Sequence, residues 1–246
     1  MLEFSGQVAL VTGAGQGLGR AIATLLARRG AIVYMADLQA EAVERAAIEL
    51  NAQGLQSVPT HTDVCDEPQL HRLRDQIAAG PGRLDVLINN AGGWRYETIR
   101  EVTPANWDWT FRTNLLSMFL ASRAFMDMMI AQRYGRIVNI SSTDAYRPKP
   151  TLPAYAAAKA AMISLTRTFA EELAPHSVLV NAVSPGAMAT ETAKSQTWLP
   201  NAVAKIPLGR AAEPEDMAEV VAFLASNRNR FVVGECVIAN GGALMA

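Results

Sequence analysis

The chain has 246 residues, half of them hydrophobic and 18% charged, with a formal net charge of −1 at pH 7. This charge argues against nucleic acid as the main partner. No uninterrupted apolar stretch is long enough to span a bilayer, since Arg123 and Asp127 interrupt the longest one. We expect no signal peptide, because the N-terminus lacks a basic region followed by a cleavable apolar core. Cys65 and Cys236 form no Cys-x-x-Cys pair and are expected to be reduced thiols of a cytoplasmic protein. The histidines show no metal-ligand spacing, so no metal site is expected.

Short apolar runs alternate with segments of helical periodicity along the chain. The sequence predicts strands over 7–12, 31–37, 57–62, 84–89, 135–141, 178–183 and 233–239. It predicts helices over 17–28, 40–52, 67–79, 104–131, 153–174 and 214–226. This alternation indicates an α/β fold with a doubly wound, seven-stranded parallel sheet of order 3-2-1-4-5-6-7. No linker or repeat divides the chain, so we expect a single domain over 1–246. Residues 187–207 have poor periodicity and are expected to form a lid over the substrate.

A glycine-rich turn follows the first predicted strand, with Gly13, Gly17 and Gly19 just before and inside the start of the first helix. Glycines let the backbone approach a pyrophosphate, and the N–H groups of the helix start point at it. The spacing is Gly-x-x-x-Gly-x-Gly, which differs from the usual dinucleotide pattern and from a phosphate loop that ends in Lys-Ser/Thr. Asp37 ends the second strand, where a carboxylate can bond the adenosine ribose and repel a 2′-phosphate. A turn aspartate is the plainer interpretation, and the two roles can coexist.

Tyr155 and Lys159 lie four residues apart, on one face of a predicted helix. An ammonium one turn away favours the phenolate, so we expect the pKa of Tyr155 to be lowered from about 10. A tyrosine tuned in this way can pass a proton to or from a substrate oxygen. Ser142 lies thirteen residues before the tyrosine, at the end of an apolar run. Taken alone, Tyr-x-x-x-Lys is a weak signal, because most such pairs merely share a helix face.

In this order and at these spacings, the motifs resemble the short-chain dehydrogenase/reductase family over essentially the whole chain. Further matching segments are Asp63-Val64, Asn89-Asn90-Ala91-Gly92 and Pro185-Gly186 with Thr190. The resemblance implies a catalytic tetrad. In it, Tyr155 is the acid/base, Ser142 polarises the substrate oxygen, Lys159 binds the nicotinamide ribose and Asn114 holds a water. It also implies a set of cofactor-binding residues: Gly13, Gln16, Gly17, Leu18, Gly19, Asp37, Asp63, Val64, Asn90, Ala91, Gly92, Tyr155, Lys159, Pro185, Gly186, Met188 and Thr190.

The cofactor expected from these residues is NAD. Gln16 stands where NADP-preferring members of the family commonly carry an arginine or lysine, and Asp37 adds its negative charge. The expected activity is therefore NAD-dependent interconversion of a secondary alcohol and a ketone.

The substrate pocket is less well defined by the sequence. Its expected walls are Trp94, Arg95, Asp144, Tyr146 and Trp198. An acid at Asp144 favours a polyol, sugar-derived or hydroxy-acid substrate over an aliphatic one. A carboxylate or phosphate could be bound by a basic residue, for which the candidates are Arg95, Arg147 and Lys149, although these are equally well explained as surface charges.

Two alternative functions remain open from the sequence. A 3-oxoacyl-acyl-carrier-protein reductase is favoured by Arg133, but His176 replaces the usual second docking arginine and most such reductases use NADPH. A cofactor-sensing protein without catalysis is disfavoured by the intact tetrad. The resemblance further implies a homodimer or homotetramer, formed by the helix that carries Tyr155, the long helix before it and the strand Cys236–Ala239.

Overall fold

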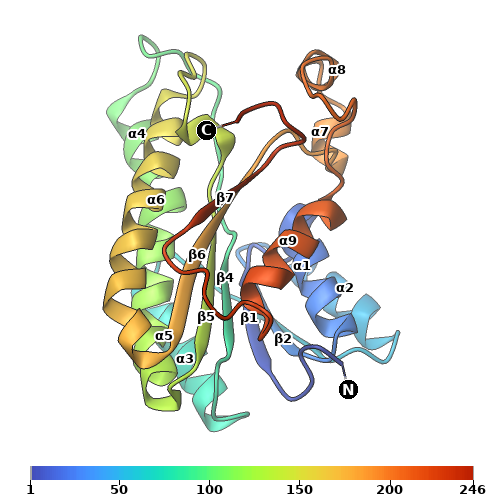
Figure 1. The fold of residues 1–246 in the computed structure, drawn as a ribbon, viewed down its shortest axis with the longest axis vertical. Coiled ribbons are helices and arrows are strands. Elements are labelled where there is room, and N and C mark those ends of the chain that lie inside the picture. Colours follow the sequence, from blue (N-terminus) through green and yellow to red (C-terminus); the bar gives the residue numbers. More distant parts are fainter. Residues whose placement is uncertain (1, 246) are drawn as a thin grey trace.

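The computed structural model describes residues 2–245 and contains one seven-stranded parallel sheet (Figure 1). The strand order is β3-β2-β1-β4-β5-β6-β7, which confirms the predicted topology. The strands are β1 (Val8–Thr12), β2 (Ile32–Asp37), β3 (Ser57–His61), β4 (Val86–Asn89), β5 (Gly135–Ile140), β6 (Val178–Pro185) and β7 (Cys236–Ala239).

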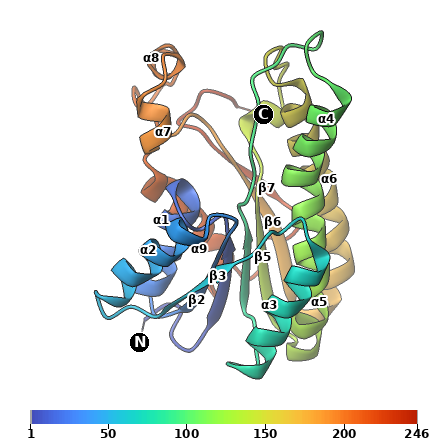
Figure 2. The same ribbon diagram turned by 180° about the vertical axis from the view of Figure 1, so that it is seen from behind.

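Helices cover both faces of this sheet, as Figures 1 and 2 show from opposite sides. One layer consists of α1 (Gly17–Arg28), α2 (Ala40–Asn51) and α9 (Pro214–Ala225). The other consists of α3 (Glu67–Ala79), α4 (Pro104–Phe111), α5 (Ser117–Gln132) and α6 (Pro153–Leu173). Two short helices, α7 (Glu191–Lys194) and α8 (Trp198–Val203), stand apart from both layers above the carboxyl ends of the strands.

Strand β1 shows why the sheet forms in the middle of the molecule. All five of its residues are buried. Ala9 and Val11 pack into the core under α1, α2 and α9, whereas Val8 and Leu10 pack into the core under α3, α5 and α6. A strand covered on both faces has no polar side, and its sequence is therefore a continuous apolar run rather than an alternating one.

The carboxyl ends of β1 and β4 mark the point where the chain reverses its direction of travel across the sheet. From β1 the chain proceeds outwards to β2 and β3, and it then returns to β4 on the other side of β1. Loops that leave two such neighbouring strands diverge, which opens a crevice at this edge of the sheet.

The predicted helix over 104–131 is interrupted in the structure. Between α4 and α5 lies a π-helical segment, Arg112–Leu116, with Asn114 fully buried at its centre. A π turn inserts one extra residue into a helix, and such turns are frequent at functional sites. Periodicity could not reveal it, because the apolar pattern continues on either side.

Among the described residues, no helix has both the length and the apolar character needed to cross a membrane.

Candidate active site

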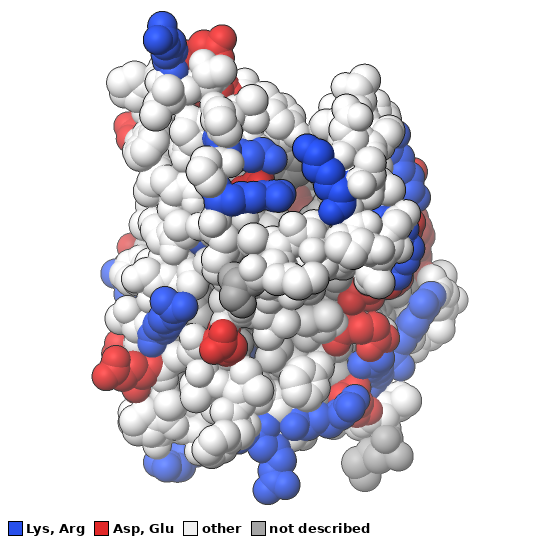
Figure 3. All heavy atoms as spheres, turned by 45° about the horizontal axis from the view of Figure 1, so that its top comes forward, with Lys and Arg blue, Asp and Glu red and all other residues white. Residues whose placement is uncertain are grey.

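A cleft of about 1830 Å³ opens at the carboxyl edge of the sheet. Its floor and walls come from residues that follow β4, β5 and β6, and from the segment that carries α7 and α8. Figure 3 shows the hollow between the two raised sides of this end of the molecule, with basic side chains at its mouth.

Most of the predicted site residues line this cleft: Gln16, Gly17, Leu18, Asn90, Gly92, Trp94, Asn114, Ser142, Asp144, Tyr155, Lys159, Pro185, Gly186, Met188, Thr190 and Trp198. Others lie beside it at the same edge of the sheet: Gly13, Gly19, Asp37, Asp63, Val64 and Ala91. Residues that lie far apart in the sequence are therefore brought together at one edge of the sheet.

The glycine-rich turn is held tightly against the loop that follows β4. Asn90 Nδ2 donates to the carbonyl oxygens of Thr12 and Gly13 at 2.9 and 3.1 Å, and Thr12 Oγ1 accepts from the backbone N–H groups of Asn90 and Ala91. A Cβ on Gly19 would lie only 2.0 Å from the oxygen of Gly13. Only glycine permits this approach of the helix start to the turn.

The N-terminus of α1 fits an anionic ligand. Gln16 at the N-cap makes no capping hydrogen bond with its side chain, and the first turn of α1 contains no acidic residue. The first N–H groups of a helix have no partner within it and carry partial positive charge. The cleft therefore offers uncapped backbone donors beside Gly17, as a pyrophosphate requires.

Asp37 is fixed in place by two backbone donors. Its Oδ2 accepts from Gly15 N at 2.8 Å, and its Oδ1 accepts from Gln39 N at 2.9 Å. The carboxylate is thus oriented at the end of β2, beside the glycine-rich turn. Both predicted roles are compatible with this geometry, because each carboxylate oxygen retains a further lone pair for a ribose hydroxyl.

Lys159 is buried in the cleft wall, with 3% of its surface exposed. Its Nζ donates to the carbonyl oxygen of Ile140 at 2.7 Å and lies 5.6 Å from the centre of the Tyr155 ring. Burial disfavours the ammonium and lowers the pKa of Lys159 to about 7. This lysine can therefore gain or lose a proton near neutral pH.

The structure corrects the expected direction of the Tyr155 pKa. Burial raises the pKa of Tyr155 well above its ordinary value, and the charges of Asp144 and Tyr96 raise it further, whereas a hydrogen bond with Ser142 lowers it. Lys159 does not offset the burial, because its own charge is destabilised in the same apolar wall.

Ser142 and Asn114 complete the predicted tetrad from two other elements. Ser142 follows β5, and its Oγ accepts from Asp144 N at 3.1 Å. Asn114 Nδ2 donates to the oxygens of Gly93 and Thr110, and its Oδ1 accepts from Gly93 N at 3.2 Å. Asn114 thereby ties the π-helical segment to the loop that follows β4.

Aromatic side chains also line the cleft. The rings of Trp94 and Tyr155 meet edge to face, with their centres 6.0 Å apart. Tyr96, which is not among the predicted site residues, also lines the cleft. It follows Trp94 by two residues, so extending the predicted wall along the same loop would have included it.

Two residues that were expected to form walls of the pocket, Arg95 and Tyr146, do not line the cleft. The guanidinium of Arg95 stacks 4.4 Å from the centre of the Trp109 ring and bonds to Asn106 on α4. Tyr146 turns instead towards Ser184 and Cys236, and burial raises the pKa of Tyr146 to about 12. Spacing along a loop could not give these directions, because each side chain follows a partner from a distant part of the chain.

Asp144 is paired with two basic side chains. Lys149 Nζ lies 3.3 Å and Arg147 Nε 3.7 Å from Asp144 Oδ1. Both basic residues also line the cleft. The wall beside Ser142 therefore carries one negative and two positive charges.

Comparison with known proteins agrees with this architecture. Residues 13–243 match the family model described as Enoyl-(Acyl carrier protein) reductase. The chain is 35% identical over 248 residues to the 3-oxoacyl-acyl-carrier-protein reductase FabG of Thermotoga maritima, covering 99% of this chain and 100% of that one. It is 36% identical over 240 residues to cyclopentanol dehydrogenase of a Comamonas species, covering 96% of each. A solved structure named as a putative gluconate dehydrogenase of Agrobacterium tumefaciens superposes with a TM-score of 0.94 at 30% identity, covering 98% of this chain and 97% of that one.

Together, the fold and the site define an oxidoreductase that uses a nicotinamide cofactor and acts on alcohol or ketone groups. The chain belongs to the short-chain dehydrogenase/reductase family.

Proposed function

We propose that this protein is an NAD-dependent oxidoreductase that interconverts a secondary alcohol and a ketone on a polar substrate. The observation that carries the proposal is the convergence of Ser142, Tyr155 and Lys159 in one cleft with the uncapped start of α1. In this proposal residues 1–246 form a single catalytic domain, with 187–207 as the substrate lid.

The chemistry divides between the cofactor and the protein. The nicotinamide, when bound, accepts or supplies the hydride. In alcohol oxidation, the phenolate oxygen of Tyr155 takes the hydroxyl proton, and in ketone reduction the phenol returns it. Ser142 Oγ donates a hydrogen bond to the same substrate oxygen and stabilises the charge that develops there. Two observations support this arrangement: Ser142 and Tyr155 line the same cleft, and Ser142 lowers the pKa of Tyr155.

Lys159 and Asn114 serve proton movement in this proposal. Lys159 Nζ, with a pKa of about 7, can hold or release a proton at neutral pH beside the Tyr155 ring. Asn114 uses both amide hydrogens and one Oδ1 lone pair on the backbone, which leaves one Oδ1 lone pair for a water. Asn114 also holds Gly93 in place, so it supports the shape of the cleft as well.

The choice of NAD over NADP is supported by the fixed carboxylate of Asp37. Its two backbone bonds hold the negative charge at the end of β2, where a 2′-phosphate would meet it. The absence of a basic residue at position 16 supports the same choice.

A 3-oxoacyl-acyl-carrier-protein reductase is the second candidate, because curated relatives with that name are 35% identical over nearly the whole chain. Two features argue against this second candidate: the carboxylate of Asp37 and the position of Arg133. Arg133 ends α5 just before β5 begins, at the edge of the sheet opposite the cleft. A carrier protein docked there would lie far from the Tyr155 of the same subunit.

The test is a steady-state screen of the purified protein with NAD and NADP against secondary alcohols, polyols and hydroxy acids, and with NADH and NADPH against acetoacetyl thioesters. We expect NAD-dependent oxidation of a polar alcohol to give the highest kcat/KM. NADPH-dependent reduction of thioesters as the best reaction would replace the proposal by the second candidate. A cofactor-sensing protein would turn over none of these substrates.

The proposed homo-oligomer has a separate test. Size-exclusion chromatography of the purified protein would distinguish a homodimer from a homotetramer.

A further inference from the structure

The cleft wall beside Ser142 carries a charge cluster made of Asp144, Arg147 and Lys149. The Asp144 side chain is 13% exposed, whereas Arg147 and Lys149 are 47% and 32% exposed. With one negative and two positive charges, the cluster retains a net charge of about +1 at neutral pH. The three residues of the cluster follow the proposed catalytic serine by two to seven positions along one loop.

The basic groups of this cluster retain their hydrogen-bonding capacity. Within residues 2–245, neither Arg147 nor Lys149 donates a side-chain hydrogen bond, although both lie within 4 Å of the same carboxylate oxygen of Asp144. The closest atom of Arg147 to that oxygen is Nε. Its two terminal nitrogens therefore remain available for a fork-shaped contact with a carboxylate.

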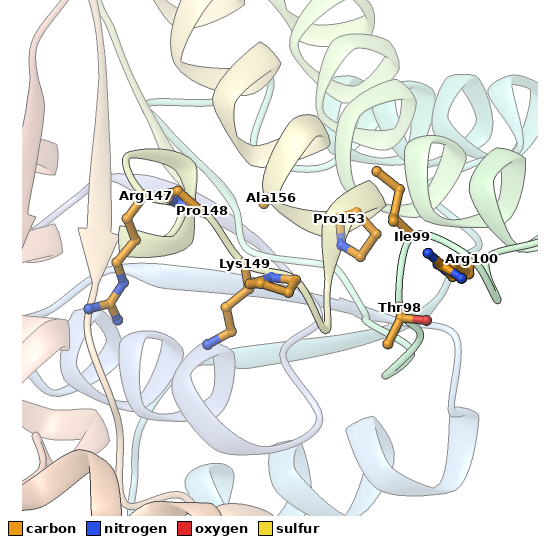
Figure 4. Close-up of a pocket in the computed structure, with 9 residues that line it drawn as sticks. Thr98, Ile99, Arg100, Arg147, Pro148, Lys149, Pro153 and Ala156 are labelled. Atoms are coloured by element: carbon orange, nitrogen blue, oxygen red, sulfur yellow. The ribbon is translucent and has the colours of Figure 1, made fainter.

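Arg147 and Lys149 also border a second, smaller pocket. This pocket of about 610 Å³ is bordered by Ile99, Arg100 and Pro153, together with the stems of Arg147 and Lys149. In Figure 4 the guanidinium of Arg147 and the ammonium of Lys149 extend away from Ile99, Arg100 and Pro153. Since both residues also line the cleft, their charged ends face the side on which Asp144 lies.

The backbone around the two bases is restricted. Pro148 and Pro150 flank Lys149 and fix their own φ angles, and Glu97 N donates to Thr151 O at 3.0 Å across to the neighbouring loop. A loop held in this way loses less conformational entropy when it binds a ligand than a free one would.

The opposite wall carries a lysine that has no acidic partner close by. Lys205 lines the cleft just after α8, and no carboxylate of residues 2–245 lies within 4 Å of it. Of the acids on that wall, Glu191 and Glu213 are paired with Lys194, and Glu215 also lines the cleft. Basic side chains therefore face the mouth of the cleft from both sides, as the blue atoms around the hollow in Figure 3 illustrate.

We propose that Arg147 and Lys149 bind a carboxylate of the substrate, so that this enzyme acts on hydroxy acids and the corresponding oxo acids. The inference rests on the proposed function, because it assigns the substrate class of the same cleft. A net charge of about +1 matches a monoanionic carboxylate better than a dianionic phosphate ester. Asp144 acts as a positioning residue that draws both bases towards the cleft.

The experiment compares a panel of 2- and 3-hydroxy acids with the methyl ester of each. Wild type, Arg147→Gln, Lys149→Gln and the control Arg100→Gln are assayed with NAD. Arg100 is a suitable control because it borders the small pocket but lies on the far side from the cluster. A charge-assisted hydrogen bond corresponds to about ten- to a hundredfold in affinity. We therefore expect each cluster variant to raise KM for the best acid about tenfold or more, with kcat and the ester kinetics nearly unchanged.

A second readout does not depend on turnover. Trp94 and Trp198 line the cleft, so tryptophan fluorescence can follow the binding of each acid and ester to the NAD complex. Weaker binding of the acid to Arg147→Gln and Lys149→Gln, but not to Arg100→Gln, would support the inference. If no substrate is oxidised, the proposed function fails, while this titration still decides whether the anion site exists.

Equal use of acids and esters by wild type would overturn the inference and leave the proposed function standing. So would variants that lose activity on acids and esters alike, because that result would assign the cluster a structural role only. A loss of acid binding in Arg100→Gln equal to that in the cluster variants would overturn it as well.

Discussion

The buried lysine makes the stability of the protein depend on pH in a direction that can be calculated. Burial lowers the pKa of Lys159 from 10.5 to about 7 in the folded protein. An unfolded chain exposes the same lysine to water, where it titrates near its ordinary value. Between these two pKa values the unfolded state therefore binds one more proton than the folded state, and the free energy of unfolding rises with pH.

Replacement of Lys159 by methionine removes this dependence. The pKa depression corresponds to about 5 kcal/mol over the whole window from pH 7 to 10.5. From pH 7 to pH 9 the free energy of unfolding rises by only about 2 kcal/mol of this total, because the folded lysine is still half protonated at pH 7. Wild type should accordingly gain about 2 kcal/mol relative to Lys159→Met over that interval. The lost bond to Ile140 O adds an offset that does not change with pH.

Urea denaturation of both cofactor-free proteins at half-unit pH steps measures this difference. Other titrating groups are common to the two proteins and cancel in the subtraction. Below about pH 6, where the lysine is protonated in both states, the difference should be flat. A difference that stays constant from pH 7 to 9, or that falls as the pH rises, would refute the argument that Lys159 is largely neutral above pH 7 in the folded state.

Further substitutions test other parts of the site. Asp37→Ala should shift the ratio of kcat/KM values towards NADP by about tenfold or more, equivalent to ~1.4 kcal/mol; a wild type that already prefers NADP would contradict the assignment. Burial and, to a smaller extent, the charge of Asp144 raise the pKa of Tyr155. Asp144→Asn should therefore move the rise of kcat/KM for alcohol oxidation to lower pH, and a shift to higher pH would count against Tyr155 as the base. Gly19→Ala places a Cβ 2.0 Å from the oxygen of Gly13, so the free energy of unfolding should fall by about 3 kcal/mol or more; an unchanged urea midpoint would show that the turn can open freely.

The fold could be predicted from the sequence because the apolar pattern of each segment agrees with its place in the sheet. Each predicted strand overlaps an observed one, since strands buried on both faces appear as short apolar runs such as Val8–Thr12. The interruption at Arg112–Leu116 was not predictable, because a single inserted residue leaves the helical pattern intact on both sides.

The candidate site was predictable in its backbone and less so in its side chains. The turn at Gly13 and the positions of Ser142 and Tyr155 follow from elements that the sheet must bring together. The directions of Arg95 and Tyr146 could not be predicted, because each depends on a partner from another element of the fold. Burial likewise decides the pKa of a side chain, and burial is known only once the helices are packed.

The most direct test of the central claim is the kinetics of Tyr155→Phe with NAD and the best alcohol from the screen. The substitution removes the phenolic oxygen that is proposed to transfer the proton and leaves the ring that packs against Trp94. We predict that kcat falls by about 10²–10⁴-fold, while the dissociation constant of NAD, measured by titration, stays within a few-fold of wild type. Retention of most of the activity by Tyr155→Phe, with NAD binding intact, would contradict the assignment of Tyr155 as the acid/base of an alcohol–ketone oxidoreductase.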